Sequence, residues 1–273
     1  MKIIDFHAHY LPEALGPDEI LQRMDAAGIE KSVMLACPDH PRYADSGLTG
    51  TNERIVELVG SHPDRFVGGV YIDPRNGMEA QTRARRYRDL GFPLAKMWPA
   101  HGFSPDDPAI YPVWEVLNEL RMGVLFHSGP LGSGHNKKPP TPLPVIRSAG
   151  FNSKFGQPVL IDQPARFFPD IQFIIAHAAY PWTLEALEES YLHRNIHIDF
   201  SCPLGFEGIN LMERLQPGRI AWDRVLFGTD SAGGGYEEDT KRWLEIAQRP
   251  FLAPHATAFF HDNAAALLKL LSS

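Results

Sequence analysis

Cysteine is scarce in this chain. Its 273 residues include only Cys37 and Cys202, which are too few for the several disulfides that hold small secreted scaffolds together. Both cysteines follow apolar runs, and we expect them to be reduced and buried. The fold must therefore depend on a hydrophobic core rather than on covalent cross-links.

Long apolar runs and clusters of basic residues are missing as well. No stretch approaches the roughly 20 apolar residues that a membrane-spanning helix needs, and no signal peptide precedes the first strand-like run. The net charge of −7, without a basic stripe, argues against non-specific nucleic-acid binding. We expect a cytoplasmic protein that binds neither membranes nor nucleic acids.

The composition that is present is typical of a globular enzyme. Hydrophobic residues make up 44% of the chain and charged residues 22%, which is enough apolar material for a substantial core. No linker rich in Pro, Gly or Ser divides the chain, and no short-period repeat is visible. We expect one domain over residues 1–273, a length that α/β barrels commonly reach.

Short apolar, β-branched runs alternate with stretches of helical periodicity along the whole chain. The runs that we interpret as strands are 2–7, 31–36, 66–72, 93–98, 123–127, 171–177, 195–200 and 224–227. Helical periodicity is clear over 52–59, 111–120, 182–191 and 243–246. Eight strands alternating with helices predict a single (β/α)8 TIM barrel. An open doubly wound sheet is the alternative, but no Gly-x-Gly-x-x-Gly motif follows the first strand.

One long segment lacks periodicity. Residues 128–157 are rich in glycine and proline, and loops of this length inside a compact domain are usually functional. Because the segment follows the fifth strand, we expect it to hang over the C-terminal mouth of the barrel and enclose the substrate. A solvated surface excursion is the alternative.

A His-x-His pair follows the first apolar run. His7 and His9 share one face of the first predicted strand, because alternate strand residues point the same way. Two imidazoles at that separation can bind one divalent metal ion. The pair alone is a weak signal, and ordinary packing would explain it equally well.

Three further polar residues occupy the ends of predicted strands. His127 ends the fifth strand, His177 the sixth, and Asp230 follows the eighth. In a barrel these positions converge on one mouth, where catalytic residues collect. Most of the other histidines among the twelve in the chain lie in predicted loops or helices. The strand-end set therefore predicts a metal site.

This set resembles the amidohydrolase superfamily. More narrowly, the chain looks like its amidohydrolase-related branch, which includes aminocarboxymuconate semialdehyde decarboxylase, related decarboxylases and lactone hydrolases. The resemblance runs nearly end to end. Besides the strand-end residues, it rests on Phe168-Pro169-Asp170-Ile171, Phe227-Gly228-Thr229-Asp230-Ser231 and Asp262-Asn263-Ala264-Ala265-Ala266-Leu267-Leu268.

The resemblance implies a role for each strand-end residue. His7, His9, His127 and Asp230 would bind one divalent metal ion, most simply zinc, with manganese, iron or cobalt as alternatives. His177 would act beside the metal as a general acid/base, a task that suits a near-neutral imidazole. Asp230 would bind the metal and also take part in proton transfer.

Lys96 is ambiguous. Some superfamily members carry a carboxylated lysine near the end of the fourth strand that bridges two metals, whereas the single-metal branch often has a lysine there that is not a ligand. A simpler role is a cation that faces an anionic substrate group. Trp98 and Arg42 are further candidates for substrate binding, and packing would explain either equally well.

Two enzymatic functions follow from the resemblance. The first is a hydrolase that cleaves a lactone, ester or amide-like bond in a small molecule by metal-activated water. The second is a non-oxidative decarboxylase of an unsaturated or aromatic acid, for which Arg42 and Arg147 could hold the departing carboxylate. The chain is compact beside many decarboxylases of this branch, which favours hydrolysis slightly. We expect a carboxylated or cyclic substrate and allow for a homo-oligomer. A non-catalytic barrel with a structural metal is disfavoured, because structural zinc usually has four protein ligands.

Overall fold

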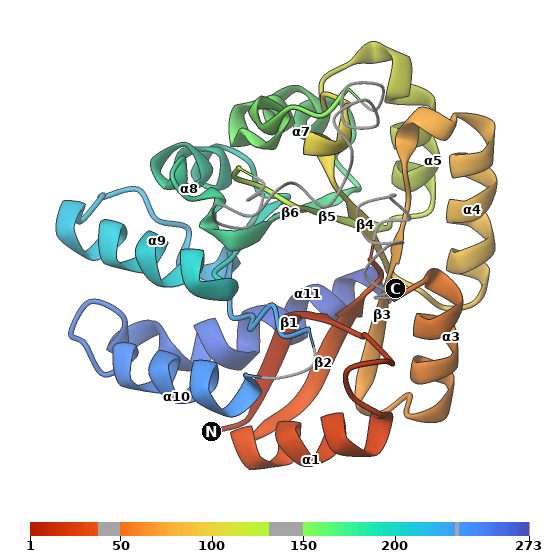
Figure 1. Ribbon diagram of the computed structural model, residues 1–273. Coiled ribbons are helices and arrows are strands. Elements are labelled where there is room, and N and C mark those ends of the chain that lie inside the picture. Colours follow the sequence, from red (N-terminus) through yellow and green to blue (C-terminus); the bar gives the residue numbers. More distant parts are fainter. Residues whose placement is uncertain (38–49, 131–149, 233–234, 273) are drawn as a thin grey trace.

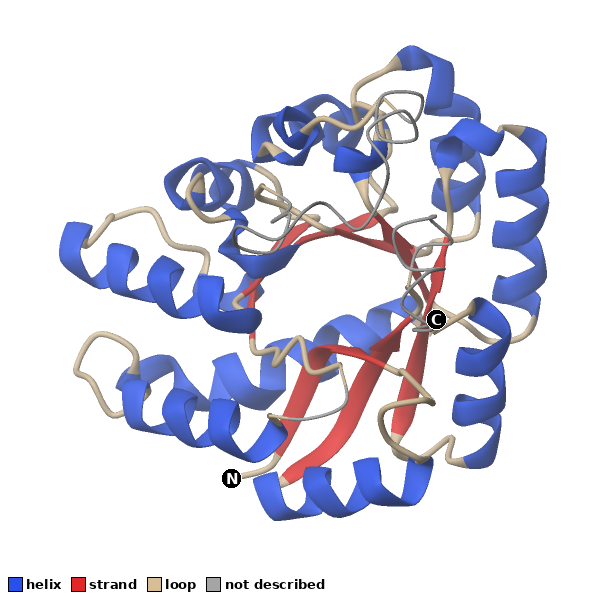
Figure 2. Ribbon diagram, in the orientation of Figure 1, coloured by secondary structure: helices blue, strands red, loops and turns tan. Residues whose placement is uncertain are grey.

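The computed structural model describes residues 1–37, 50–130, 150–232 and 235–272. Parallel strands form one sheet in the order of the sequence, each paired with the next (Figures 1 and 2). They are β1 (Ile3–His9), β2 (Ile29–Leu35), β3 (Phe66–Tyr71), β4 (Leu94–Met97), β5 (Gly123–Phe126), β6 (Gln172–Ile175), β7 (Ile196–Asp199) and β8 (Val225–Leu226). This arrangement confirms the predicted (β/α)8 barrel, and every predicted strand overlaps an observed one.

Backbone hydrogen bonds close the barrel between β1 and the chain at β8. The amide of Phe6 donates to the carbonyl of Phe227 at 2.9 Å, and the amide of His9 donates to the carbonyl of Ser231 at 2.7 Å. Closure brings the end of β1 beside residues 228–231. The histidine pair and the segment after β8 therefore share one mouth.

Helices cover the outside of the strands (Figure 2). The α-helices of the described residues are α1 (Pro17–Ala27), α3 (Asn52–Ser61), α4 (Met78–Asp89), α5 (Tyr111–Glu119), α7 (Asp162–Phe167), α8 (Thr183–Leu192), α9 (Cys202–Leu215), α10 (Tyr236–Ile246) and α11 (Asn263–Leu271). Short turns of helix join them: η1 (Pro74–Asn76), η2 (Pro99–His101), η3 (Pro108–Ile110), η4 (Ser153–Gly156), η5 (Pro158–Ile161), η6 (Ala176–Ala179), η7 (Trp222–Arg224), η8 (Ala253–His255) and η9 (Ala258–Asp262). The helices predicted over 52–59, 111–120, 182–191 and 243–246 all lie within or along these elements.

The helix α3 illustrates how the sequence sets these elements. Thr51 caps it by accepting a hydrogen bond from the amide of Arg54, which satisfies one of the free donors of the first turn. Ile55 and Leu58 point inward and are buried. None of the helices in the described part of the chain is long and apolar enough to cross a membrane.

The core has two layers. Most buried apolar residues lie between the strands and the outer helices. A second cluster fills the barrel itself, where Phe6, Leu35 and Leu125 from the strands pack with Leu267 and Leu271 of α11. The helix α11 lies across the barrel interior in Figure 1. Because side chains fill the lower part, polar residues can collect only at the mouth.

Two regions with predicted roles in substrate binding lie partly or wholly outside the described residues. These are Arg42 and most of the segment 128–157, of which residues 131–149, including Arg147, are not described. The proposal that this segment encloses the substrate therefore stays a prediction.

Candidate metal centre

The strand β1 supplies the predicted histidine pair. His7 and His9 lie among its last three residues, after an irregularity of the strand register between Asp5 and Ala8. His7 is fully buried, and His9 is 8% exposed. The pair thus lies at the barrel mouth, within reach of side chains from other strands.

Hydrogen bonds orient both imidazole rings in the same way. His7 Nδ1 donates to Asp199 Oδ2 at 2.8 Å. His9 Nδ1 donates to the carbonyl oxygen of Leu35 at 2.9 Å. The opposite nitrogens face Asp230, whose Oδ1 lies 3.3 Å from His7 Nε2 and 3.4 Å from His9 Nε2. A donated hydrogen bond from Nδ1 leaves a lone pair on Nε2, the form that a metal ligand needs.

Asp230 is held in place by its backbone and its neighbours. It adopts a left-handed conformation with φ 56°, which costs a non-glycine residue about 1–3 kcal/mol and often marks a functional site. Its amide donates to the carbonyl of His7 at 2.6 Å. The preceding residue, Thr229, donates from its amide and its hydroxyl to Asp5 at 3.0 and 2.7 Å. This network fixes the carboxylate over the histidine pair.

His127 and His177 lie next to each other on the other side of the mouth. The amide of His127 donates to the carbonyl of Met97 at 2.9 Å, so the residue continues β5 by one position. His177 lies in η6 with φ 59°, and its Nε2 is 3.1 Å from His127 Nδ1. Donor atoms of His7, His177 and Asp230 lie within 4.8 Å of one another. His177 is thus close enough to His7 and Asp230 for these three side chains to hold a metal ion together.

Asp199 and Ser201, which sequence reasoning missed, join the two histidine groups. Asp199 ends β7, and both side chains are buried. Ser201 Oγ donates to Asp199 Oδ1 and lies 3.1 Å from His7 Nδ1 and 2.9 Å from His177 Nδ1. The position of Asp199 at a strand end was a signal that the sequence offered, in the same way as for Asp230.

Burial keeps three of the four imidazoles neutral. Together with the nearby Lys96 ammonium, it lowers the pKa of His7 to about 4. Burial also lowers the pKa of His177, and it lowers that of His127 well below the usual value. His9 differs, because Cys37 and Asp230 raise its pKa to about 9 although burial opposes its charge. The three neutral imidazoles have lone pairs for a metal ion or a proton.

The two carboxylates at the mouth are ionised. Burial alone would raise the pKa of Asp199, but His7 and its hydrogen bond hold it at about 2. Burial likewise opposes ionisation of Asp230, yet His7, His9 and His177 hold its pKa well below the usual value. The negative charges of Asp199 and Asp230 favour a cation at the mouth.

Lys96 and Trp98 also reach the site. The Lys96 side chain is fully buried, and its Nζ lies 3.2 Å from His7 Nε2. Trp98 stacks on His127, with ring centroids 4.8 Å apart and planes 25° apart. Of the three residues expected to bind substrate, these two are at the site, and Arg42 lies outside the described residues.

A cavity of about 240 Å³ opens above these residues. Among the described residues its polar lining comes from His9, His127, His177 and Asp230, and its remaining walls are Leu11, Cys37, Trp98 and Ala232. Small-molecule sites commonly combine apolar walls with a few placed polar groups. The dimensions suit a small organic molecule with one polar end.

The donor set fits a divalent metal ion. His127 Nε2 is buried and has no hydrogen-bond partner among the described residues, which is costly for a polar atom unless a ligand satisfies it. Imidazoles with a carboxylate suit zinc, manganese, iron or cobalt. Hydrogen bonds from the far side of the His7 and His9 rings are those that usually orient metal-binding histidines.

Comparison with known proteins agrees with this fit. A model of the amidohydrolase family matches residues 4–270. None of the curated proteins matches the chain.

Several solved structures share the fold. An uncharacterized TIM-barrel protein from Bordetella bronchiseptica has 19% identity over 100% of both chains, with a TM-score of 0.73. A 2,6-dihydroxybenzoate decarboxylase from Rhizobium has 17% identity over 99% of both chains, with a TM-score of 0.68. A 5-carboxyvanillate decarboxylase from Novosphingobium aromaticivorans, complexed with manganese, has 15% identity and a TM-score of 0.68, covering 98% of this chain and 96% of its own. At these identities the likeness establishes the fold alone.

Proposed function

Because the chain belongs to the amidohydrolase family, we propose that it is a metal-dependent decarboxylase of a small unsaturated or aromatic acid. The observation that carries this proposal is the apolar cavity directly above the histidines, which suits a ring with one charged end. The two decarboxylases among the similar structures support the choice.

His7, His9, His127 and Asp230 would hold one divalent ion, with zinc first and manganese, iron or cobalt as alternatives. When bound, the ion supplies positive charge that orients and polarises an oxygen of the substrate. Asp199 holds the His7 ring by the 2.8 Å hydrogen bond to its Nδ1. The ligands are thus fixed before the ion arrives, which lowers the cost of binding it.

The walls of the cavity would bind the substrate's ring, and the charge of the nearby Lys96 would attract its acid group. Trp98 presents an aromatic wall held against His127, and Leu11 supplies an aliphatic wall. Lys96 does not line the cavity, but its buried ammonium lies 3.2 Å from His7 Nε2, and its charge would attract an acidic substrate group. Enclosure by apolar walls excludes water from the reacting carbon.

His177 would move the proton. In the reaction the bond from the substrate carbon to its carboxylate carbon breaks, carbon dioxide leaves, and a proton from solvent replaces it on the carbon. His177 lines the cavity, and Ser201 Oγ lies 2.9 Å from its Nδ1, which fixes the ring. A buried imidazole with a lowered pKa can pass a proton in either direction.

Hydrolysis, the first expectation from the sequence, is the second candidate. Asp230 favours it, because its carboxylate lies 3.3 Å from His7 Nε2 and 3.4 Å from His9 Nε2 and its side chain is 28% exposed. A carboxylate in this position can orient a water molecule by accepting a hydrogen bond from it. A lactone or ester would then be opened at the same site.

Carbon dioxide release separates the two reactions. We would load the protein with zinc or manganese and supply hydroxybenzoates, unsaturated acids and lactones, measuring carbon dioxide and acid formation in parallel. Carbon dioxide from an acid with replacement of its carboxylate by hydrogen is the expected result. Acid formation from a lactone without carbon dioxide would overturn decarboxylation in favour of hydrolysis.

Two variants test the site itself. We expect His177→Asn to lower turnover by about 10²–10⁴-fold. His197→Asn is the matched control, because His197 is also buried but lies on β7 and contacts Gln172 instead of the site. Equal losses in both variants would show that the activity depends on folding alone and not on His177.

Metal analysis gives an independent test of the ligands. We expect one equivalent of a divalent metal per chain, lost on His7→Ala or His9→Ala. A metal-free protein with full activity would refute the site. Two equivalents of metal per chain would instead indicate that Lys96 bridges two metal ions, as a carboxylated lysine does in some superfamily members.

A further inference from the structure

A second cluster of metal-binding side chains lies in the helical layer outside the barrel. Asp162 is the first residue of α7, Glu189 lies in α8, and His193 directly follows α8. One donor atom from each of the three side chains lies within 4.8 Å of the other two. None of the three side chains lines the cavity at the barrel mouth. The cluster is therefore separate from the metal centre described above.

The local sequence produces this arrangement. Glu189 and His193 are four residues apart, and the amide of His193 donates to the carbonyl of Glu189 at 3.0 Å, so the two side chains lie on the same face one helical turn apart. Asp162 approaches from α7, and its Oδ1 lies 2.8 Å from His193 Nε2. Glu189 Oε2 lies 3.6 Å from the same nitrogen. The imidazole nitrogen thus faces one carboxyl group from each helix.

Glu189 supplies the observation that points to a ligand. Its side chain is only 8% exposed. Its Oε2 is buried and has no hydrogen-bond partner among the described residues. A polar oxygen is costly to bury in this way unless a ligand satisfies it. A divalent ion held between the three side chains would give Oε2 that partner.

The charges around the cluster favour a cation. Asp162 and Glu189 bring two carboxyl groups together, and Glu185 lies one turn before Glu189 on α8. Arg166 opposes them, because its guanidinium contacts Asp162 at 2.7 Å. However, the Arg166 side chain is 56% exposed, and exposed ion pairs of this kind are weak. The Asp162 side chain is 33% exposed, which leaves an ion a path from solvent.

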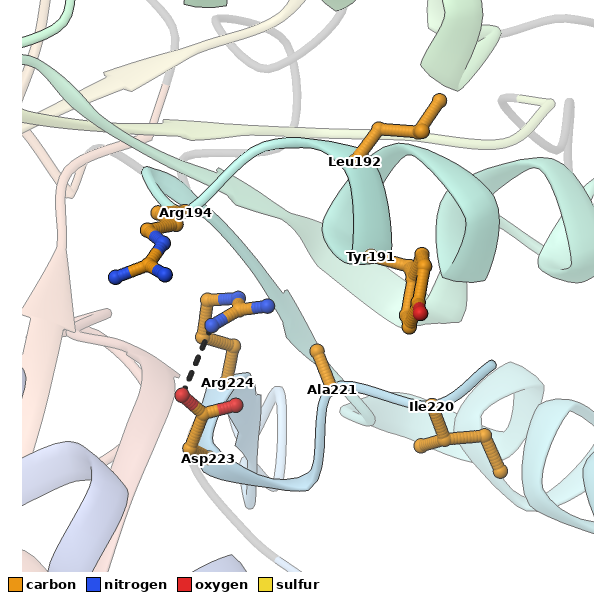
Figure 3. Close-up of a pocket in the computed structure, with 7 residues that line it drawn as sticks. All are labelled: Tyr191, Leu192, Arg194, Ile220, Ala221, Asp223 and Arg224. Atoms are coloured by element: carbon orange, nitrogen blue, oxygen red, sulfur yellow. Dashed lines mark hydrogen bonds and ion pairs between the residues drawn. The ribbon is translucent and has the colours of Figure 1, made fainter. Parts of the chain in front are cut away.

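A groove at the C-terminal end of α8 differs from the cluster. It has a volume of about 670 Å³ and includes Arg194, the residue after His193. Figure 3 shows Arg194 and Arg224 at this groove, with Arg224 paired to Asp223 at 2.8 Å. Two guanidinium groups and one carboxylate give the lining a net positive charge, which repels a cation. A metal ion in solution would therefore bind at the cluster and not in this groove.

We propose that Asp162, Glu189 and His193 form a second divalent-metal site, the outer site, which joins α7 to α8. Two carboxylates and one imidazole suit zinc, manganese or cobalt, with water completing the coordination. As the ion binds, it takes the place of the proton between His193 Nε2 and Asp162 Oδ1, and this proton passes to solvent. Because Arg166 competes for Asp162, the outer site should bind zinc more weakly than the mouth and fill only when zinc is added. The inference is independent of the proposed reaction.

Calorimetry tests the outer site with protein that already holds one equivalent of metal at its mouth. Zinc would be titrated into this protein, and we expect one further equivalent to bind. Loss of a residue that only supports a ligand typically weakens metal binding 10–100-fold, so Glu189→Gln or His193→Gln should weaken the second equivalent at least ~100-fold. Glu188→Gln is the matched control, because Glu188 is the neighbouring carboxylate on α8 but pairs with Arg219 at 2.8 Å.

Two results of this titration would overturn the outer site. One is a parent protein that binds no further zinc, and the other is a Glu189→Gln variant that is folded by circular dichroism and keeps the parent's affinity. Lys96→Met separates the outer site from a bridged pair of ions at the mouth. The second equivalent should persist in Lys96→Met, and its loss there would assign it to the mouth instead.

Anomalous diffraction locates the ion without any variant. Crystals of the parent protein soaked in zinc should show a zinc peak at about 2.0–2.2 Å from Glu189 Oε2 and His193 Nε2. A peak at the barrel mouth alone would overturn the proposal, since it would show that the three outer side chains satisfy one another without an ion.

Discussion

Replacing Asp199 by Asn should weaken metal binding although Asp199 is not a ligand. Its Oδ2 accepts from His7 Nδ1 at 2.8 Å. Its Oδ1 accepts from the amides of Ser201 at 2.9 Å and His177 at 3.2 Å, and from the Ser201 hydroxyl. An asparagine side chain has only one oxygen, and we expect that oxygen to take the place of Oδ1, where it accepts hydrogen bonds from the three donors. The side-chain nitrogen of the asparagine then faces His7 Nδ1, so that two hydrogen-bond donors meet with no acceptor between them.

The size of the effect follows from that mismatch. Without an acceptor, His7 must move its proton to Nε2 or rotate, and either change removes the lone pair that faces Asp230. Loss of such a supporting hydrogen bond typically costs 10–100-fold in metal affinity, which is about 1.4–2.7 kcal/mol. A buried hydrogen bond to a charged group contributes a similar amount, about 1.5–3 kcal/mol. The two estimates agree.

Competition with a chromophoric chelator measures the affinity directly. Metal-free parent and variant proteins would be titrated with zinc, and their folding checked by circular dichroism. His197→Gln is the control on the same strand, since His197 is buried but makes its hydrogen bond to Gln172 outside the site. An unchanged zinc affinity in a folded Asp199→Asn protein would refute the role of Asp199. An equal loss in His197→Gln would assign the effect to β7 as a whole.

Three further changes probe the site and the helical layer. His127→Ala should lose the metal, whereas His177→Asn should retain it. If elemental analysis found metal in His127→Ala and none in His177→Asn, His177 would be the ligand and His127 would not. Lys96→Met should keep the metal but raise KM for an acidic substrate, whereas metal loss would make Lys96 a ligand. The pKa of Glu189 in α8 is raised to about 7 by burial and by nearby Asp162, so the folded protein keeps a proton that the unfolded chain loses above its usual pKa of 4.5. The free energy of unfolding should therefore fall by about 1.4 kcal/mol per pH unit between those values, and Glu189→Gln should remove that slope in urea titrations.

The barrel could be predicted because its signals repeat. Each strand is a short apolar run, and eight such runs alternate with helices. A mistake of a few residues in any one strand does not alter that count. The predicted first strand, 2–7, stops short of His9, whereas β1 continues to it. The strand's pairing with β2 and its closure with the chain after β8 extend it, and neither is visible locally in the sequence.

The ligand candidates could be predicted because strand ends of a parallel barrel meet. His7, His9 and Asp230 do converge, as the pattern indicated. The same rule applied to β7 would have selected Asp199. It was overlooked although His197 stands two residues before it, because the strand-end set was taken only from the first, fifth, sixth and eighth strands. Its importance lies in a contact with a residue 192 positions away.

The relation between His127 and His177 could not be derived from the sequence. Both residues end apolar strands, and apart from the family resemblance nothing in the sequence indicates which of them is a metal ligand and which an acid/base. The structure distinguishes them by backbone and partners. His127 continues a strand and stacks on Trp98, whereas His177 lies in a left-handed turn beside Ser201. Such differences depend on side-chain directions at the strand ends, which periodicity does not encode.

The arrangement also explains why so polar a mouth is compatible with a stable fold. Burying an unpaired charge is costly, yet Asp199 and Asp230 are both ionised at the barrel mouth. The cost of burying the Asp199 charge is offset by the four hydrogen bonds that its carboxylate accepts within the fold, without a metal ion. Asp230 instead faces two imidazole nitrogens at 3.3 and 3.4 Å and the open cavity. The fold thus satisfies one carboxylate internally and leaves the other facing the cavity, and this asymmetry supports the proposal that Asp230 rather than Asp199 binds the metal.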